Sequence, residues 1–226
     1  LVANEKVEGS TPFARSNIMS NDKRSSIKEI FNLAIDNQKK NNLKIAKDLY
    51  NEILKINPTL HEVYNNLGLI FFIEGENEKA KLNYNKAIDI KPNFTNAYQN
   101  LGLLFQKLGN NEEAKKCFKK VIKINPNLVN AQYNLGLVLQ KMGDNEEAKK
   151  SFKKVIEINP KITEAYNNLG VVHSNMGEFK EAIDNYDIAI TNNKNFNNAK
   201  ENLISSLTCS DSDINNPIVY ANNCLK

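Results

Sequence analysis

The sequence predicts an all-α chain, a solenoid in which a pair of antiparallel helices is repeated along the molecule. The first observation is a motif: Tyr-Asn-Asn-Leu-Gly at Tyr64 returns in related form at Tyr98, Tyr133 and Tyr166, with a period of about 34 residues. The second is a glycine and then an alanine that follow each motif at fixed distances, and the third is a proline that closes four units. A period of this length is typical of two short helices joined by a turn.

The first helix of each unit is predicted from apolar residues three and four places apart, and it holds a glycine in its interior. This glycine column is Gly68, Gly102, Gly136 and Gly170. A glycine inside a helix costs about 1 kcal/mol relative to alanine, so we expect another backbone to approach closely there. A second glycine column follows where the apolar pattern stops, and it supplies the left-handed residue that ends a helix. Its members are Gly75, Gly109, Gly143 and Gly177.

The second helix of each unit carries a small residue and then an aromatic one. The small residues are Ala80, Ala114, Ala148 and Ala182, and the aromatic residues are Tyr84, Phe118, Phe152 and Tyr186. We expect the alanines to allow tight packing and the rings to fill the space between units. Proline ends the helix, because it lacks an N–H and disfavours the helical conformation in the residue before it. The prolines are Pro58, Pro92, Pro126 and Pro160.

These columns divide the chain into a leader, a repeat region, a cap and a tail. We expect a disordered leader over residues 1–22, with native translation starting at Met19, because residues 7–12 spell a translated tRNA T-arm. Five units then fill residues 23–196, at 27–60, 61–94, 95–128, 129–162 and 163–196. A capping helix is expected over residues 197–208, with Leu203, Ile204 and Leu207 on it, and a tail over residues 209–226.

Composition excludes several classes of function. A net charge of +4 from 30 basic and 26 acidic residues is too small and too interspersed to predict a nucleic acid or membrane partner. Nothing approaches eighteen consecutive apolar residues, so no transmembrane span is expected. The three cysteines lack the spacing of a zinc site or a disulfide framework, which favours a reducing, cytoplasmic location. No catalytic constellation and no cofactor or metal site is predicted.

These residues and their register resemble the tetratricopeptide repeat (TPR) family. The resemblance implies a right-handed solenoid whose first helices line a concave groove, and it implies a protein or peptide partner in that groove. In this family, groove-facing side chains come from the second, fifth, sixth, ninth, twelfth and thirteenth places of each unit. The chain is similar in this respect to the TPR region of O-GlcNAc transferase-like proteins.

The sixth place of every unit, the cap included, is an asparagine. The set is Asn32, Asn66, Asn100, Asn134, Asn168 and Asn202, here named the asparagine ladder. An asparagine amide offers one acceptor and two donors, which match the C=O and N–H of a peptide backbone. The resemblance implies that the ladder grips an extended chain largely independently of sequence. The alternative is a structural role, because asparagine before Leu-Gly is common in TPR sequences and abundant throughout this chain.

Other groove places predict selectivity. Polar and basic residues at the twelfth and thirteenth places favour an acidic or polar ligand: Gln38, Lys39, Gln106, Lys107, Gln140 and Lys141. In the second unit Phe72 and Ile73 take these places beside Leu69, an apolar patch that either anchors a ligand side chain or packs beneath the N-terminal segment. Phe31 and Tyr133 are either further ligand contacts or structural residues.

Other polar signals are interpreted as structural. The lysines of residues 115–123 and 149–154 are expected to form a solvated face, with helix-stabilising pairs from Glu112 to Lys116 and from Glu146 to Lys150. His173 is expected to be a packing residue, and Cys117 a buried or half-buried one.

The sequence favours a non-enzymatic scaffold that binds an extended peptide or disordered segment through the asparagine ladder. An alternative is that the chain is the substrate-recruiting TPR region of a longer, glycosyltransferase-like enzyme that continues beyond Lys226. A third alternative is weak self-association through the cap or the apolar patch. The sequence does not name the ligand.

Overall fold

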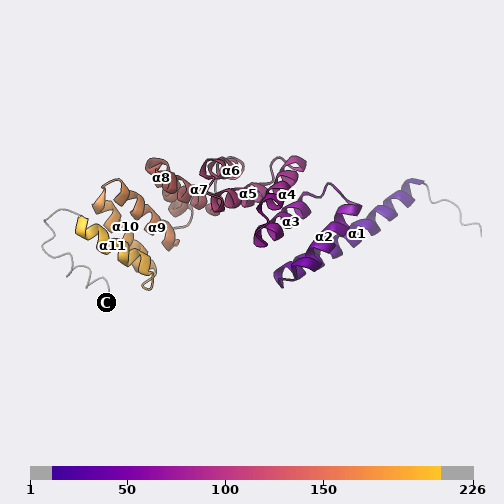
Figure 1. Ribbon diagram of the computed structural model, residues 1–226, viewed down its shortest axis with the longest axis horizontal. Coiled ribbons are helices and arrows are strands. Elements are labelled where there is room, and N and C mark those ends of the chain that lie inside the picture. The colour runs from indigo at the N-terminus through magenta and orange to yellow at the C-terminus, as the bar shows by residue number, and fades with distance from the viewer. Residues whose placement is uncertain (1–11, 210–226) are drawn as a thin grey trace, which may run out of the picture. The chain divides into compact units, whose positions relative to one another are not determined.

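The computed structural model describes residues 12–209, with side chains from residue 26 to 208, and in this range it is entirely α-helical (Figure 1). The helices are α1 (Pro12–Lys39), α2 (Leu43–Ile56), α3 (His61–Ile73), α4 (Asn77–Ile90), α5 (Thr95–Lys107), α6 (Asn111–Ile124), α7 (Val129–Met142), α8 (Asn145–Ile158), α9 (Thr163–Asn175), α10 (Phe179–Asn192) and α11 (Asn197–Cys209). The predicted all-α solenoid of paired helices is confirmed. Residues 1–11 of the expected leader and nearly all of the expected tail, residues 210–226, lie outside the described residues. From Pro12 onward the leader is part of α1, where disorder had been expected.

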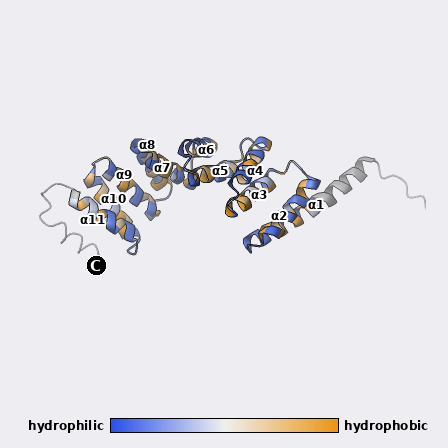
Figure 2. Cartoon of the chain, viewed as in Figure 1, coloured by the Kyte–Doolittle hydropathy of each residue, from blue (hydrophilic) through white to orange (hydrophobic). Residues whose placement is uncertain are grey.

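The chain divides at Pro92 into two compact units, residues 1–92 and 93–226, which are described separately. In unit 1, α1 packs on α2 and α3 on α4, around a core that includes Tyr50, Ile53 and Ile70. In unit 2, consecutive helices from α5 to α11 pack on one another. Apolar residues recur three and four places apart between polar ones along these helices, so each helix has an apolar face that packs in the core (Figure 2).

The interior glycines make room for an aromatic ring, so the expected close approach of another backbone was wrong. A Cβ on Gly68 would lie 2.6 Å from the ring of Tyr84, and one on Gly136 would lie 2.7 Å from the ring of Phe152. Both rings come from the second helix of the same repeat and are fully buried. The second glycine column takes the expected left-handed conformation, with φ of +81° at Gly143. Asn41 takes this role in the first repeat, with φ of 62°.

The ends of the second helices explain part of the asparagine content. Asn125 follows α6 in an extended conformation, with φ −135° and ψ 94°, as the proline after it requires. Its side-chain oxygen accepts a hydrogen bond from the backbone N–H of Asn127 at 3.3 Å, and Asn159 does the same for Lys161 at 3.1 Å. These local turns satisfy backbone groups where the chain leaves each helix.

One alignment within the repeat motif was wrong. The residue equivalent to Tyr64 in the fourth repeat is Gln132, one place before Tyr133. The Tyr64 hydroxyl donates to the Pro58 carbonyl oxygen at 3.0 Å, and the Gln132 amide donates to the corresponding carbonyl oxygen of Pro126 at 3.3 Å. Tyr133 therefore belongs to the next place and faces in a different direction.

The C-terminal helix α11 closes unit 2 by packing on α9 and α10. Leu203 and Leu207 are buried in a core with Tyr186, whereas Ile204 is 39% exposed. The predicted capping helix is confirmed as an ordered helix, with one of its three apolar residues facing outward.

Candidate functional site

The predicted site residues lie in both units. Asn32, Lys39, Asn66, Leu69, Phe72 and Ile73 belong to unit 1, and Asn100, Gln106, Lys107, Tyr133, Asn134, Gln140, Lys141, Asn168 and Asn202 belong to unit 2. In unit 2 the first helices of neighbouring repeats contact one another, α5 with α7, α7 with α9 and α9 with α11. This arrangement brings the ladder residues of unit 2 into one row of helices, here named the amide face.

Two asparagines of the amide face are bonded to the preceding repeat. The Asn168 side-chain N–H donates to the Tyr133 hydroxyl oxygen at 2.9 Å, which joins α9 to α7. The Asn202 N–H donates to the Asn167 side-chain oxygen at 3.0 Å, which joins α11 to α9. Each of these two side-chain amides therefore donates one hydrogen bond that joins neighbouring first helices.

One of the two ladder residues of unit 1, Asn66, is bonded in a similar way. The Asn66 N–H donates to the Tyr50 hydroxyl oxygen at 3.1 Å, and that hydroxyl donates to the side-chain oxygen of Gln38 at 2.8 Å. The chain of bonds therefore crosses α3, α2 and α1. Burial raises the pKa of Tyr50, and the hydrogen bond from Asn66 opposes the shift. Asn32, with no repeat before it, is exposed.

Asn134 differs from these residues. It is half-buried on α7, and its side chain has no hydrogen-bond partner among residues 26–208. The preceding repeat explains the difference, because Phe118 stands where Tyr50 offers a hydroxyl to Asn66, and Gln99 stands where Tyr133 serves Asn168. The amide of Asn134 is thus positioned on the amide face with its full hydrogen-bonding capacity.

Both aromatic candidates take part in packing. The rings of Phe31 and Tyr50 meet edge to face with centroids 5.9 Å apart, and those of Tyr133 and Phe152 do so at 5.8 Å. Tyr133 also holds Asn168 through its hydroxyl, and burial is the main cause of its raised pKa. The apolar patch of unit 1 is uneven, since Ile73 is 55% exposed while Leu69 and Phe72 are half-buried.

The predicted selectivity residues of unit 2 lie in the last turns of α5 and α7. Gln106 and Gln140 are half-buried, and Lys107 and Lys141 are exposed in the last turns of α5 and α7. Because α5 contacts α7, the two Gln-Lys pairs end neighbouring helices.

The lysines of the second helices are paired differently from expectation. Lys116 bonds Glu113 at 2.6 Å and not Glu112, and Lys149 rather than Lys150 meets Glu146, at 3.5 Å. Longer-range bridges also connect a second helix with the following repeat, as Lys115 does with Asp144 at 2.8 Å and Lys47 with Glu74 at 2.7 Å in unit 1. The (i, i+4) charge pattern of the sequence did not predict these ion pairs between repeats.

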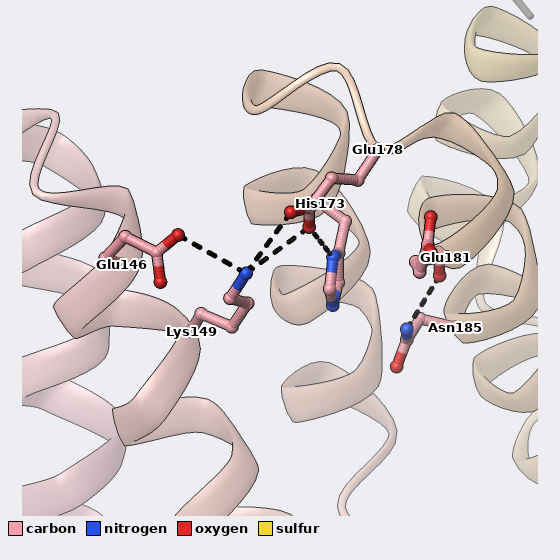
Figure 3. A network of polar contacts seen from close by, with 6 residues as sticks. All are labelled: Glu146, Lys149, His173, Glu178, Glu181 and Asn185. Carbon is pink, nitrogen blue, oxygen red and sulfur yellow. Dashed lines mark hydrogen bonds and ion pairs between the residues drawn. The ribbon is translucent and has the colours of Figure 1, made fainter.

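A polar network at the turn between α9 and α10 was missed from the sequence (Figure 3). His173 is 5% exposed, as expected of a packing residue, but its Nδ1 also meets the Glu178 carboxylate at 2.5 Å. Lys149 from α8 approaches the same carboxylate at 3.3 Å. The hydrogen bond with His173 is the largest cause of the lowered pKa of Glu178. Only the five-residue spacing of a histidine and a glutamate across a turn could have indicated it.

Cys117 is 8% exposed, as predicted, and burial raises the pKa of its thiol to about 12. Among the described residues, no group of three His, Cys, Asp or Glu side chains is arranged to hold a metal ion. No helix within residues 12–209 has both the length and the apolar character needed to cross a bilayer.

Solved structures with the same fold include three proteins of low sequence identity. The crystal structure of MamA protein has a TM-score of 0.67, with 23% identity over 74% of this chain and 92% of that chain. YrrB, described as a TPR protein with an unusual peptide-binding site, has a TM-score of 0.68, with 22% identity over 79% of this chain and 96% of that chain. Pseudomonas aeruginosa pilF has a TM-score of 0.75, with 18% identity over 90% and 89%.

Family models give the remaining comparison. A model described as TPR repeat matches residues 68–109, and one described as tetratricopeptide repeat matches residues 95–128, 129–162 and 163–196. These matches cover more than half of the 226 residues. No curated protein matches the chain. On its repeats and its fold, the chain belongs to the tetratricopeptide repeat family.

Proposed function

We propose that this chain is a protein-binding scaffold that holds an extended peptide or disordered segment along the amide face of unit 2, with Asn134 as the main contact to the peptide backbone. The observation that carries the proposal is the state of the asparagines on α7, α9 and α11. Asn168 and Asn202 are bonded to the preceding repeat, whereas Asn134 has no partner among the described residues.

This proposal narrows the role of the asparagine ladder. A net hydrogen bond contributes about 0.5–1.5 kcal/mol, so a peptide gains less from an amide whose donor is already engaged. The remaining N–H and the carbonyl oxygen of Asn168 and Asn202 are secondary contacts. Ordering the peptide offsets several kcal/mol of the interaction, so we expect affinities near micromolar or weaker.

The ends of α5 and α7 supply the selectivity of the proposed site. Lys107 and Lys141 are exposed beside half-buried Gln106 and Gln140, so acidic or amide side chains of the peptide fit there. The YrrB structure, described as having an unusual peptide-binding site, supports a peptide as the class of ligand. In unit 1, exposed Ile73 with Leu69 and Phe72 is proposed as a separate apolar anchor for a ligand side chain.

A binding role requires no catalytic group, and we propose that the chain is not itself an enzyme. We also propose a cytoplasmic location. The buried Cys117, with its raised pKa, is poorly suited to thiol chemistry and is compatible with a reducing compartment.

The test uses peptides selected for binding from a displayed random library, with affinities measured by isothermal titration calorimetry. Asn134→Ala should weaken binding about tenfold, because the unpartnered amide is lost. Asn127→Ala, in an exposed turn, is the matched control and should leave the affinity unchanged. Selected peptides that bind the wild type and the Asn134→Ala variant equally well, with unchanged helicity, would defeat the proposal.

A further inference from the structure

A cavity of about 350 Å³ opens between the second helices α8 and α10, away from the amide face, with α9 as its floor. Lys153 and Ile156 line it from α8, and Tyr166, Leu169 and His173 line it from α9. Glu181, Asp184 and Asn185 complete it from α10. Its size lies at the lower end of the range for ligand pockets, about 300–1,000 Å³. Nothing in the proposed peptide-binding function uses it.

An ion pair that the preceding repeat makes is not formed across this cavity. One repeat earlier, Lys119 on α6 bonds Glu147 on α8 at 2.9 Å. The residues at the corresponding places are Lys153 and Glu181, and neither has an ion-pair partner among residues 26–208. The carboxylate of Glu181 is therefore exposed on one wall of the cavity without a cation.

The wall on α10 is acidic where the earlier second helices are basic. Lys116 and Lys150 occupy one place of the repeat on α6 and α8, and Asp184 occupies it on α10. Asp184 is exposed, lines the cavity and has no ion pair among the described side chains. Two unpaired carboxylates one helical turn apart thus face the same cavity.

Earlier repeats show that a tyrosine at the place of Tyr166 can carry a cation over its ring. At the place of Tyr166, earlier repeats have Tyr64 and Tyr98, and each ring carries a lysine of its own repeat. The Lys86 ammonium lies 4.9 Å from the Tyr64 ring centroid, and the Lys120 ammonium lies 5.9 Å from the Tyr98 ring centroid. The residue at the place of these lysines in the fifth repeat is Ile188. Tyr166 is therefore left without the internal cation that its counterparts have.

His173 is an independent indication of a ligand that donates hydrogen bonds. It is 5% exposed and lines the cavity, and Glu178 holds its Nδ1 at 2.5 Å (Figure 3). In the neutral tautomer that donates Nδ1–H to Glu178, Nε2 carries a lone pair, and it has no partner among the described residues. Lys149 fixes Glu178 from the other side at 3.3 Å, which holds the ring in this orientation.

We propose that this cavity binds the guanidinium group of an arginine side chain presented by a protein partner. A planar guanidinium has five donors and no acceptor, which suits two carboxylates and the Nε2 of His173. Its face stacks on the Tyr166 ring, and Leu169 and Ile156 pack against its aliphatic stem. The ammonium of Lys153 on the opposite wall opposes the bound charge, so this residue lowers the affinity.

The test uses the full chain, labelled with ¹⁵N, and titrates it with N-acetyl-L-arginine amide while amide shifts are followed by NMR. We expect saturable shifts over α9 and α10 and a Kd in the millimolar range. The matched probe N-acetyl-L-citrulline amide has the same shape without the charge and should produce no saturable shift. Equal binding of the two probes, or no saturation by the arginine probe, would overturn the proposal.

Variants locate the site. The double substitution Glu181→Gln/Asp184→Asn should weaken binding of the arginine probe about tenfold. Glu112→Gln/Glu157→Gln changes the net charge equally outside the cavity and should have no effect; a similar loss in this control would contradict the site. Tyr166→Leu should weaken binding about threefold, and Lys153→Gln should strengthen it. If free L-arginine bound more tightly than the capped probe, the guanidinium would come from a free amino acid, and the proposal of a protein partner would be wrong.

Discussion

Two junctions between repeats follow one another in unit 2 and share a backbone plan, yet they offer different surfaces. Where α5–α6 meets α7–α8, the amide of Asn134 is unpartnered and Lys119 bridges Glu147 at 2.9 Å on the other side. Where α7–α8 meets α9–α10, Asn168 is bonded to Tyr133 at 2.9 Å and a cavity is open on the other side. The repeat fixes the backbone, and a few polar places decide which groups each junction leaves for a partner.

The comparison assumes that the two junctions have the same backbone packing, and substitutions at the interior glycines test this assumption. Gly136→Val and Gly170→Val should each lower the free energy of unfolding by about 2–3 kcal/mol, because an added Cβ would lie within 2.7 Å of Phe152 or 2.6 Å of Tyr186. Lys141→Val, exposed on α7, is the control and should change it by less than about 0.5 kcal/mol. Urea denaturation measures all three. A large loss at one glycine and none at the other would mean that the junctions do not pack alike.

Two substitutions should exchange the hydrogen-bonding states of Asn134 and Asn168 at the two junctions. Tyr133→Phe removes the acceptor of Asn168 and should lower the free energy of unfolding by about 1 kcal/mol. It should also strengthen binding of the library-selected peptides, because the amide of Asn168 becomes available. Gln99→Tyr places a hydroxyl one repeat before Asn134 and should weaken the same binding. Isothermal titration calorimetry of both variants measures these changes in peptide affinity. Unchanged affinity in both variants would show that the hydroxyl of the preceding repeat does not control whether the asparagine binds peptide.

Most of the helix architecture could be predicted from the sequence, because Gly, Ala, aromatic and Pro columns are local constraints that recur in register. The expectation failed where the partner of a residue was not local. The interior glycines were matched to a backbone, but the group that approaches Gly136 is the Phe152 ring. Glu112 was paired with Lys116 along one helix, whereas Lys116 bonds Glu113 and the other bridges cross to the next repeat.

The candidate site was less predictable for the same reason. All six ladder asparagines look equivalent in sequence, and only the residues that face them from the preceding repeat distinguish Asn134 from Asn168. Those facing residues, Phe118 and Gln99 for Asn134, lie 16 and 35 positions earlier, which can be recognised only when the packing of repeats is known.

The smallest expected effect concerns the carboxylates at the two junctions. The pKa of Glu147 is lowered chiefly by its hydrogen bond with Lys119, and the pKa of Glu178 chiefly by its hydrogen bond with His173. A lowered folded-state pKa means that each contact stabilises the fold fully above the ordinary value of 4.5 and loses its effect as the pH falls below it. The urea midpoints of Glu147→Gln and Glu178→Gln should therefore lie below that of the wild type near pH 7 and approach it in acid. Glu164→Gln, exposed on α9, serves as the control and should show no such convergence. A midpoint difference for Glu178→Gln that widens in acid would contradict the sign of the shift, and with it the assignment of Glu178 as the ionised partner that orients His173.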